Sequence, residues 1–184
     1  MMRKKPMLAY PVSDKPIDYN NTVFMQPKLD GVRCLIQANI KRHILTPDLN
    51  EIEVKAYSRT GKEWLNIDHI LESLIPFFKA NPDVILDGEL YNHALRDDFE
   101  KIISCVRKTK PTAIDRAESR KLVQFHCYDI VDETMTFVDR IHKLNRLFQV
   151  PGQSHLRDAY GIRFVKTESV LDEKDAKLFH NHCL

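Results

Sequence analysis

Hydrophobic and polar residues follow two different periods in this chain, and each period predicts its own kind of element. Short apolar runs rich in β-branched and aromatic residues, bounded by Gly, Pro, Asn or Asp, predict strands. These runs are residues 23–25, 32–38, 53–58, 84–86, 122–131 and 161–167. Apolar residues spaced three and four apart predict helices. These segments are residues 67–81, 99–106, 137–148 and 171–182. Because strands come early and helices interrupt them later, the order indicates an α+β fold with mostly antiparallel sheets flanked by helices.

Polar residues at the starts of these helices are candidate N-caps. They are Asn66 for the first helix, Asp97 or Asp98 for the second and Thr136 for the third. Between the second helix and the next strand, a polar and basic segment around Pro111 is expected to form a loop. The local excess of Lys and Arg over residues 101–121 predicts either a surface that follows a phosphate backbone or solvated helix faces.

The bulk composition is that of an ordinary globular domain. A length of 184 residues suits one domain with a sizeable core, and 43% hydrophobic and 29% charged residues are usual proportions. The net charge of +2 excludes a strong global field toward nucleic acid. The four cysteines form no C-x-x-C pair and follow no secretory signal, so we expect free thiols in a reducing compartment. No apolar run approaches the length of a membrane span.

Residues 28–33 carry the first candidate chemistry, the motif K-x-D-G-x-R. It resembles the nucleophile motif of the covalent nucleotidyltransferases, a superfamily that contains DNA ligases, RNA ligases and mRNA capping enzymes. There the lysine attacks the α-phosphorus of a nucleotide and carries the nucleotide as a phosphoramidate. The alternative is structural, because Asp30-Gly31 between hydrophobic runs is a strong two-residue turn signal that would join the first two predicted strands in a hairpin.

Three further segments match motifs of the same superfamily in the same order. Residues 58–61 resemble the S-R-x-G element of DNA ligases, residues 86–90 resemble the D-G-E-L motif, and residues 125–130 resemble an aromatic strand that ends in Tyr-Asp or Phe-Asp. Four matches in order are more specific than any one of them. The closest resemblance is to the small ATP-dependent DNA ligases of phage and bacterial type. It implies a nucleotidyltransferase (ATP-grasp-like) adenylation domain.

The resemblance implies a role for each matched residue. Lys28 would attack ATP and form lysyl-AMP. The expected nucleotide-binding residues are Gln26, Arg33, Arg59, Glu89 and Phe125. Among these, Arg33 and Glu89 would bind the ribose and Phe125 would stack on the purine. The expected supporting residues are Asp30, Gly31 and Gly88. The expected ligands of Mg²⁺, directly or through water, are Glu89 and Asp87.

The resemblance stops before the last two motifs of the family. Members continue into a glutamate-containing motif IV and a motif V with paired lysines, but no Glu-Gly pair follows residue 131 here. We therefore expect residues 1–184 to form a partial adenylation domain, incomplete at its C-terminal side and without an oligonucleotide-binding barrel.

The family also implies the surroundings in which the chain works. It implies ATP and Mg²⁺ as cofactors, nicked double-stranded DNA as partner, a monomer without membrane association, and the cytoplasm of a bacterial cell or a phage-infected host. DNA repair, replication or recombination would be the setting. Two alternatives stay open: a catalytically deficient remnant that binds ATP or DNA, and an RNA ligase or capping-type nucleotidyltransferase. The S-R-x-G element favours a DNA ligase over the second alternative.

Overall fold

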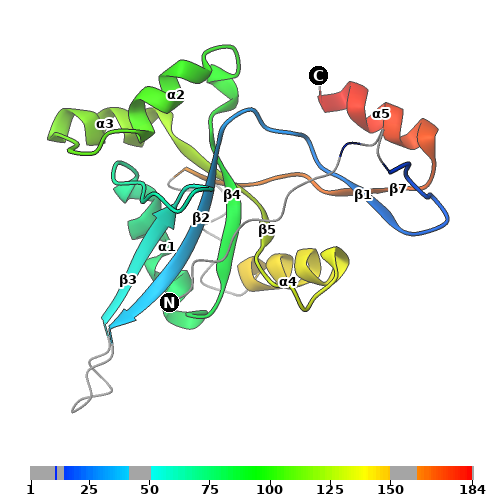
Figure 1. Cartoon of the computed structure of the whole chain (residues 1–184), viewed down its shortest axis with the longest axis horizontal. Helices are drawn as coiled ribbons and strands as arrows, with labels where there is room; N and C mark the ends of the chain where they lie inside the picture. The colour runs from blue at the N-terminus through cyan, green and yellow to red at the C-terminus, as the bar shows by residue number, and fades with distance from the viewer. Residues whose placement is uncertain (1–10, 12–14, 42–50, 150–160, 184) are drawn as a thin grey trace. The chain divides into compact units, whose positions relative to one another are not determined.

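The computed structural model of the chain is drawn in Figure 1. It describes residues 11, 15–41, 51–149 and 161–183. The chain divides into two compact units, each with its own sheet and apolar cluster. The described residues of the larger unit are 30–41, 51–149 and 161–164, and those of the smaller unit are 11, 15–29 and 165–183.

The sheet of the larger unit has five strands in the order β3-β2-β4-β5-β6. In chain order they are β2 Val32–Lys41, β3 Glu51–Tyr57, β4 Ile85–Tyr91, β5 Gln124–Ile130 and β6 Ile162–Phe164. Neighbouring strands are antiparallel except β5 and β6, which run parallel. The predicted α+β class with mostly antiparallel pairing is therefore confirmed, and each strand predicted for this unit exists with shifted ends.

Helices cover this sheet and extend from one of its ends. The described ones are α1 Asp68–Ala80, α2 Phe99–Val106, α3 Ala113–Leu122 and α4 Phe137–Gln149, with a short 3-10 turn, η2 His93–Leu95, after β4. Helix α1 packs against β3 and α4 against β5, whereas α2 and α3 contact each other (Figure 1). None of the described helices is long and apolar enough to cross a membrane.

Two of the predicted caps begin their helices as expected. The side chain of Asp98 accepts a hydrogen bond from the backbone N–H of Lys101 at 3.2 Å, and α2 starts at the next residue. The hydroxyl of Thr136 accepts from the backbone N–H of Asp139 at 3.3 Å, and α4 starts directly after it. Both side chains satisfy backbone donors that a first helical turn leaves without a partner.

Two local predictions are wrong. The segment expected as a basic loop contains α3, because Thr112 and Asp115 form a reciprocal capping box that starts a helix. Asn66 does not cap α1, since Ile67 occupies that position. The Asn66 amide is buried and donates instead to the carbonyl of Cys105 at 2.9 Å. The Asn66 side chain, which the local pattern predicts as a helix cap, thus makes a tertiary contact instead.

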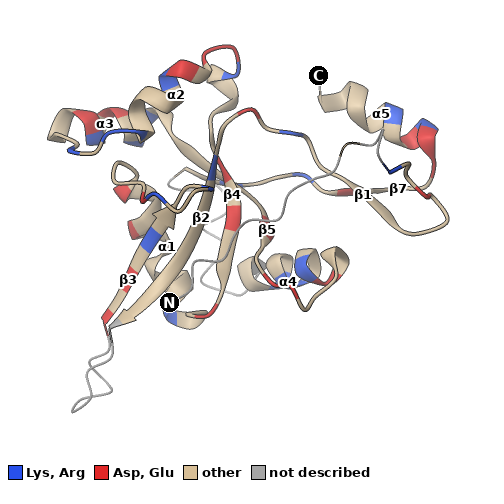
Figure 2. Cartoon of the chain, viewed as in Figure 1, with Lys and Arg blue, Asp and Glu red and all other residues tan. Residues whose placement is uncertain are grey.

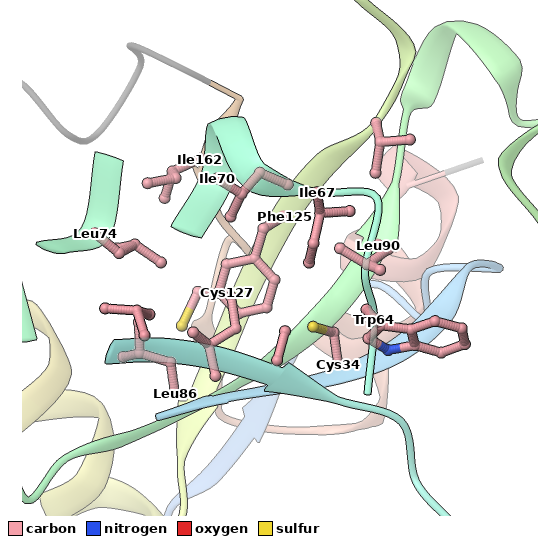
Figure 3. Packing of buried hydrophobic residues seen from close by; sticks show 14 of the residues in the cluster. Cys34, Trp64, Ile67, Ile70, Leu74, Leu86, Leu90, Phe125, Cys127 and Ile162 are labelled. Carbon is pink, nitrogen blue, oxygen red and sulfur yellow. The ribbon is translucent and has the colours of Figure 1, made fainter. Parts of the chain in front are cut away.

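The core of the larger unit lies between one face of its sheet and helices α1 and α4 (Figure 3). Alternate strand residues point into it: Cys34, Ile36, Leu86, Leu90, Phe125 and Cys127. From the helices, Phe77 of α1 stacks on Phe148 of α4 with their ring centroids 4.4 Å apart. Burying such rings contributes roughly 1.5–3 kcal/mol each. The strand residues between these buried ones project from the opposite face of the sheet.

The described part of the smaller unit contains one antiparallel pair of strands and a helix. Strand β1 Val23–Met25 pairs antiparallel with β7 Glu168–Val170, and α5 Glu173–Cys183 follows. Residues Val170, Ala176 and Phe179 form its buried cluster. The hairpin predicted at Asp30-Gly31 is wrong, because β1 pairs with β7 and β2 pairs with β3 and β4.

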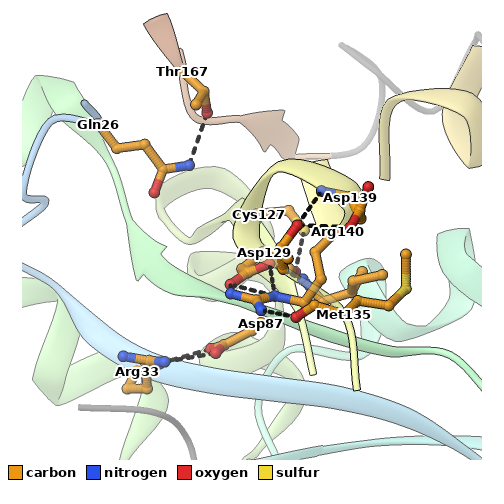
Figure 4. Close-up of polar contacts among 11 residues, drawn as sticks. Gln26, Arg33, Asp87, Cys127, Asp129, Met135, Asp139, Arg140 and Thr167 are labelled. Carbon is orange, nitrogen blue, oxygen red and sulfur yellow. Dashed lines mark hydrogen bonds and ion pairs between the residues drawn. The ribbon is translucent and has the colours of Figure 1, made fainter. Parts of the chain in front are cut away.

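A buried ion pair joins α4 to the sheet (Figure 4). Arg140 of α4 donates from Nε to Asp129 Oδ1 at 2.9 Å and from Nη2 to Asp129 Oδ2 at 2.9 Å. Both side chains are less than one-tenth exposed. Arg140 Nη1 also donates to the carbonyl of Met135 at 2.9 Å. Removing one member of such a pair leaves an uncompensated charge inside the protein.

We therefore predict that Arg140→Met lowers the free energy of unfolding by about 3–5 kcal/mol, as measured by urea denaturation. Lys143→Met on the same helix is the matched control, since it breaks a more exposed pair with Asp132, at 3.4 Å, and is expected to cost about 1 kcal/mol or less. Equal losses from both substitutions would contradict the prediction.

Candidate active site

A row of polar side chains crosses the sheet face opposite the core. The strand register places Arg33 of β2 opposite Glu89 of β4, Glu89 opposite His126 of β5, and His126 beside Arg163 of β6. All four are half-buried. Directly opposed residues have Cβ atoms about 4.5–5.5 Å apart, so the row brings two predicted site residues, Arg33 and Glu89, next to each other.

Arg33 is held by Asp87, the first residue of the D-G-E-L motif (Figure 4). Its Nε donates to Oδ1 at 2.6 Å and its Nη2 donates to Oδ2 at 2.5 Å. Burial raises the pKa of the Asp87 carboxyl, and the Arg33 guanidinium opposes that rise. The sequence predicts Asp87 as a ligand of Mg²⁺, directly or through water, and because both oxygens are engaged and the side chain is 1% exposed, Asp87 does not fit direct coordination. Its position is that of an anchor for Arg33.

One aromatic residue on this face is Tyr128, which the sequence reasoning did not assign. Cys127 lies opposite Gly88 and Asp129 lies opposite Asp87, so Tyr128 is an extra residue in β5 at the register shift. A β-bulge of this kind re-aims a side chain. Arg33 Cζ lies 5.1 Å from the centroid of the Tyr128 ring. Burial raises the pKa of Tyr128 well above its usual range, so the phenol stays protonated.

Tyr128 also contacts Glu89, the second residue of the polar row. The Tyr128 hydroxyl donates to Glu89 Oε2 at 3.5 Å. Arg33, Glu89 and Tyr128 therefore form one connected group on three neighbouring strands. The alternation of the strand is the signal that could have found Tyr128, because Phe125 and Cys127 share one face and Tyr128 lies on the other.

Phe125 occupies the core, and its predicted stacking on a nucleotide base is wrong. Its side chain is 0% exposed and belongs to the buried cluster (Figure 3). The ring covers Gly88 so closely that a Cβ there would lie 2.6 Å from Phe125 Cε2. Position 31 also has no room for a side chain, since a Cβ on Gly31 would lie 2.5 Å from the carbonyl oxygen of Leu90. Both expected supporting glycines thus allow close approach of neighbouring strands.

An open pocket of about 500 Å³ lies on the larger unit and gathers residues of three motifs. Its lining contains Gly31, Arg33, Arg59 and Glu89 from the predicted site. The lining also contains Lys62, Trp64, Phe99, Ile103 and Arg107, which the sequence reasoning did not assign. Four cations thus meet one carboxylate along an apolar wall. Such a pocket can bind an anionic group attached to an apolar or aromatic body.

Arg59 enters this pocket on a tight turn after β3. Ser58 and Lys62 pair their backbones, with Ser58 N–H donating to the Lys62 carbonyl at 2.7 Å. Lys62 N–H donates to the Ser58 hydroxyl at 2.9 Å. Gly61 closes the turn with φ of 82°, a conformation that favours glycine. The S-R-x-G sequence therefore builds a turn whose exposed second residue, Arg59, projects from it.

The smaller unit carries the other two predicted residues. Gln26 follows β1, and its Nε2 donates to the Thr167 hydroxyl at 2.8 Å (Figure 4). Lys28 lies in the irregular segment after β1 and is exposed. The exposed Asp30 begins the larger unit two residues later. Gln26 and Lys28 therefore belong to the smaller unit, and Arg33, Arg59 and Glu89 belong to the larger one.

Most charges of the basic segment 101–121 are balanced by acidic neighbours (Figure 2). The ion pairs are Lys101–Glu118 at 2.6 Å, Lys108–Asp115 at 3.1 Å, Arg120–Glu72 at 3.6 Å and Arg116 with Asp68. This favours solvated helix faces over a continuous phosphate-binding surface for α3. Arg107 differs, since it lines the pocket. Among the described residues, no three His, Cys, Asp or Glu side chains gather as a metal site.

Comparison with known proteins relates the chain to one family and one fold. Residues 6–178 match the family described as ATP dependent DNA ligase domain. A solved structure named "Pmar-Lig_Pre." is similar with a TM-score of 0.64 and 21% identity over 95% of this chain and 38% of that chain. A structure from work on Lig E DNA ligases gives 0.63 and 16% over 98% of this chain and 57% of that chain.

The ATP-dependent DNA ligase from bacteriophage T7, in complex with ATP, gives a TM-score of 0.56 and 14% identity over 86% of this chain and 52% of that chain. The chain thus spans between about two-fifths and three-fifths of the length of these three structures. At these identities the likeness establishes the fold, and it confirms the predicted adenylation-domain architecture. Comparison with curated protein sequences finds no match.

The opposite placements of the two aromatic residues on β5 can be tested by stability. Phe125→Ala is expected to lower the free energy of unfolding by about 3–5 kcal/mol, because it empties a fully buried site. Tyr128→Ala should cost only about 1–2 kcal/mol, because its side chain is half-buried. Urea denaturation of both variants measures the difference, and an equal or reversed order would contradict these positions.

Proposed function

The chain belongs to the family of ATP-dependent DNA ligase domains, and from that premise we propose that it is the nucleotide-transferring part of a DNA ligase. The observation that carries the proposal is the pocket that gathers Arg33, Arg59 and Glu89. These residues come from three separate motifs and two of them are cations. A site of this composition suits a nucleotide, which combines charged phosphates with a polar sugar and an aromatic base.

Lys28 is the proposed nucleophile. Its ε-amine, after losing a proton, attacks the α-phosphorus of ATP. A nitrogen–phosphorus bond forms, the bond from the α-phosphorus to the bridging oxygen breaks, and pyrophosphate leaves. An oxygen of the 5′-phosphate of a nicked DNA strand then attacks the α-phosphorus, the nitrogen–phosphorus bond breaks and the Lys28 amine is restored. The adjacent 3′-hydroxyl attacks the 5′-phosphorus, which seals the nick, and AMP leaves. Arg33 and Arg59 are proposed to stabilise charge on the phosphates, because fixed cations beside a transferring phosphoryl group lower its barrier.

Tyr128 replaces Phe125 as the residue proposed to stack on the base. Its ring is half-buried on the face that carries Arg33 and Glu89. Glu89 is proposed to accept hydrogen bonds from the ribose. Mg²⁺ is usually held by one or two carboxylates together with substrate phosphates. Glu89 would therefore serve as its protein ligand when ATP brings the ion, while Asp87 stays paired with Arg33.

DNA is proposed to reach the same pocket from the side of α2. Arg59, Lys62 and Arg107 line it as exposed cations that can hold phosphates. Phe99 and Ile103 supply an apolar wall against which a sugar or base can pack. This arrangement supports a nucleic-acid end as the second substrate.

The proposal predicts a covalent AMP adduct on Lys28. Intact-protein mass spectrometry after incubation with ATP and Mg²⁺ should show one added AMP. Lys28→Arg should show none, because a guanidinium keeps the charge but is not a nucleophile. Lys15→Ala, at another lysine of the smaller unit, should keep the adduct. An adduct that survives Lys28→Arg would remove Lys28 from the proposed role.

The proposed DNA contact at Arg107 predicts a change in salt dependence. Arg107→Ala should reduce the slope of log affinity for nicked duplex DNA against log salt by about 0.9, the effect of one lost phosphate contact. Arg120→Ala is the control, because Arg120 is paired with Glu72 on α1 and lies outside the pocket lining. Fluorescence anisotropy across a salt series gives both slopes. An unchanged slope for Arg107→Ala would contradict the contact.

A further inference from the structure

His126 lies in the polar row beside Glu89, yet no motif includes it as a functional residue. It is the direct register partner of Glu89 on β4 and of Arg163 on β6. It also precedes Tyr128 by two residues on the same face of β5. The Cβ atoms of His126 and Glu89, the proposed ribose ligand, are therefore about 5 Å apart, on the same side of the sheet as the proposed stacking ring.

The hydrogen bond of His126 determines its tautomer. Its Nε2 lies 3.0 Å from Oε1 of Gln124, and a carbonyl oxygen can only accept. Nε2 therefore carries the proton. In a neutral ring the other nitrogen, Nδ1, is then an acceptor. Burial, followed by the charges of Arg163 and His93, lowers the pKa of His126 to about 4, so the ring is neutral near pH 7.

The acceptor nitrogen is available to a ligand. Within the part of the chain that the structure describes, no hydrogen bond reaches Nδ1 of His126. His126 is half-buried, so part of the residue is open to solvent. Tyr91 packs edge-on against the imidazole at 5.2 Å between ring centroids. Tyr91 thus supports one side of the His126 ring, and Nδ1 is left as an acceptor for another molecule.

We infer that His126 is a further nucleotide-contacting residue, whose Nδ1 accepts a hydrogen bond from a ribose hydroxyl beside Glu89 and so favours ribonucleotides over deoxynucleotides. The inference rests on the proposed function, because it takes the nucleotide to lie over Glu89 and Tyr128. A ribose has two vicinal hydroxyls, and Glu89 and His126 are two adjacent acceptors on neighbouring strands. A deoxynucleotide would leave one acceptor without its donor, which costs affinity.

The experiment compares the affinities for ATP, 2′-deoxy-ATP and 3′-deoxy-ATP. Isothermal titration of the full chain without Mg²⁺ keeps the binding non-covalent. Wild type should bind ATP about 3- to 10-fold more tightly than at least one of the deoxy analogues, the effect of one neutral hydrogen bond. In His126→Phe this preference should fall to about 1 because ATP affinity drops while affinity for that analogue is unchanged. His126→Asn, which restores an acceptor, should recover part of the preference.

Two controls separate a specific contact from a structural effect. His93→Phe changes an exposed neighbouring histidine and should leave the preference intact. Gln124→Met leaves residue 126 a histidine but removes the acceptor that holds the proton on Nε2, so the preference should fall. The Gln124 variant also covers the case in which phenylalanine at position 126 impairs folding.

The outcomes distinguish this inference from the proposed function. A preference that is the same in wild type and His126→Phe, in a chain that binds ATP and forms the Lys28 adduct, overturns the inference alone. A wild-type chain that binds ATP and both deoxy analogues equally also overturns it alone. No binding of ATP by the wild-type chain, together with no adduct, overturns both.

Discussion

Two buried carboxylates, Asp87 and Asp129, lie opposite each other on neighbouring strands, and the arginines that neutralise them organise the larger unit. Arg33 forms an ion pair with Asp87, and Arg140 forms one with Asp129. Leaving either carboxylate without its arginine would cost several kcal/mol. One arginine is thereby fixed on the functional face of the sheet, and the other ties α4 to β5. The same requirement for charge compensation therefore shapes both the site and the core.

A bulge lies beside these carboxylates, at the register shift between Asp87 and Gly88. Strand alternation places Tyr128 on the face of Arg33 and Glu89, while Phe125 packs on the core face against Gly88, and the extra residue brings Asp129 into register with Asp87. The glycine of the D-G-E-L motif is thus needed for packing, and its neighbours Asp87 and Glu89 supply polar groups to the opposite face. A short motif can therefore serve structure and chemistry at once, because successive strand residues point to opposite faces.

Sequence reasoning reached the correct fold class and most of the strands and helices, but it missed α3 and β7 and failed where distant parts of the chain compete. The Asp30-Gly31 signal is local, whereas β1 finds its partner in β7, more than 140 residues away along the chain. Asn66 has the chemistry of a cap, yet its amide is taken by a carbonyl of α2. In α3 a local signal decides the structure: the Thr112–Asp115 capping box starts a helix where a loop was expected.

The sequence by itself determined the α+β class, the order of the elements and the motifs that lead to a DNA ligase family, because these depend on local periodicity and on side-chain chemistry along the chain. Only the tertiary structure decided which carboxylate is paired with an arginine and which histidine lies beside Glu89. Those outcomes depend on strand register, on a one-residue bulge and on charge pairing between distant segments. None of these is encoded at a fixed spacing along the chain.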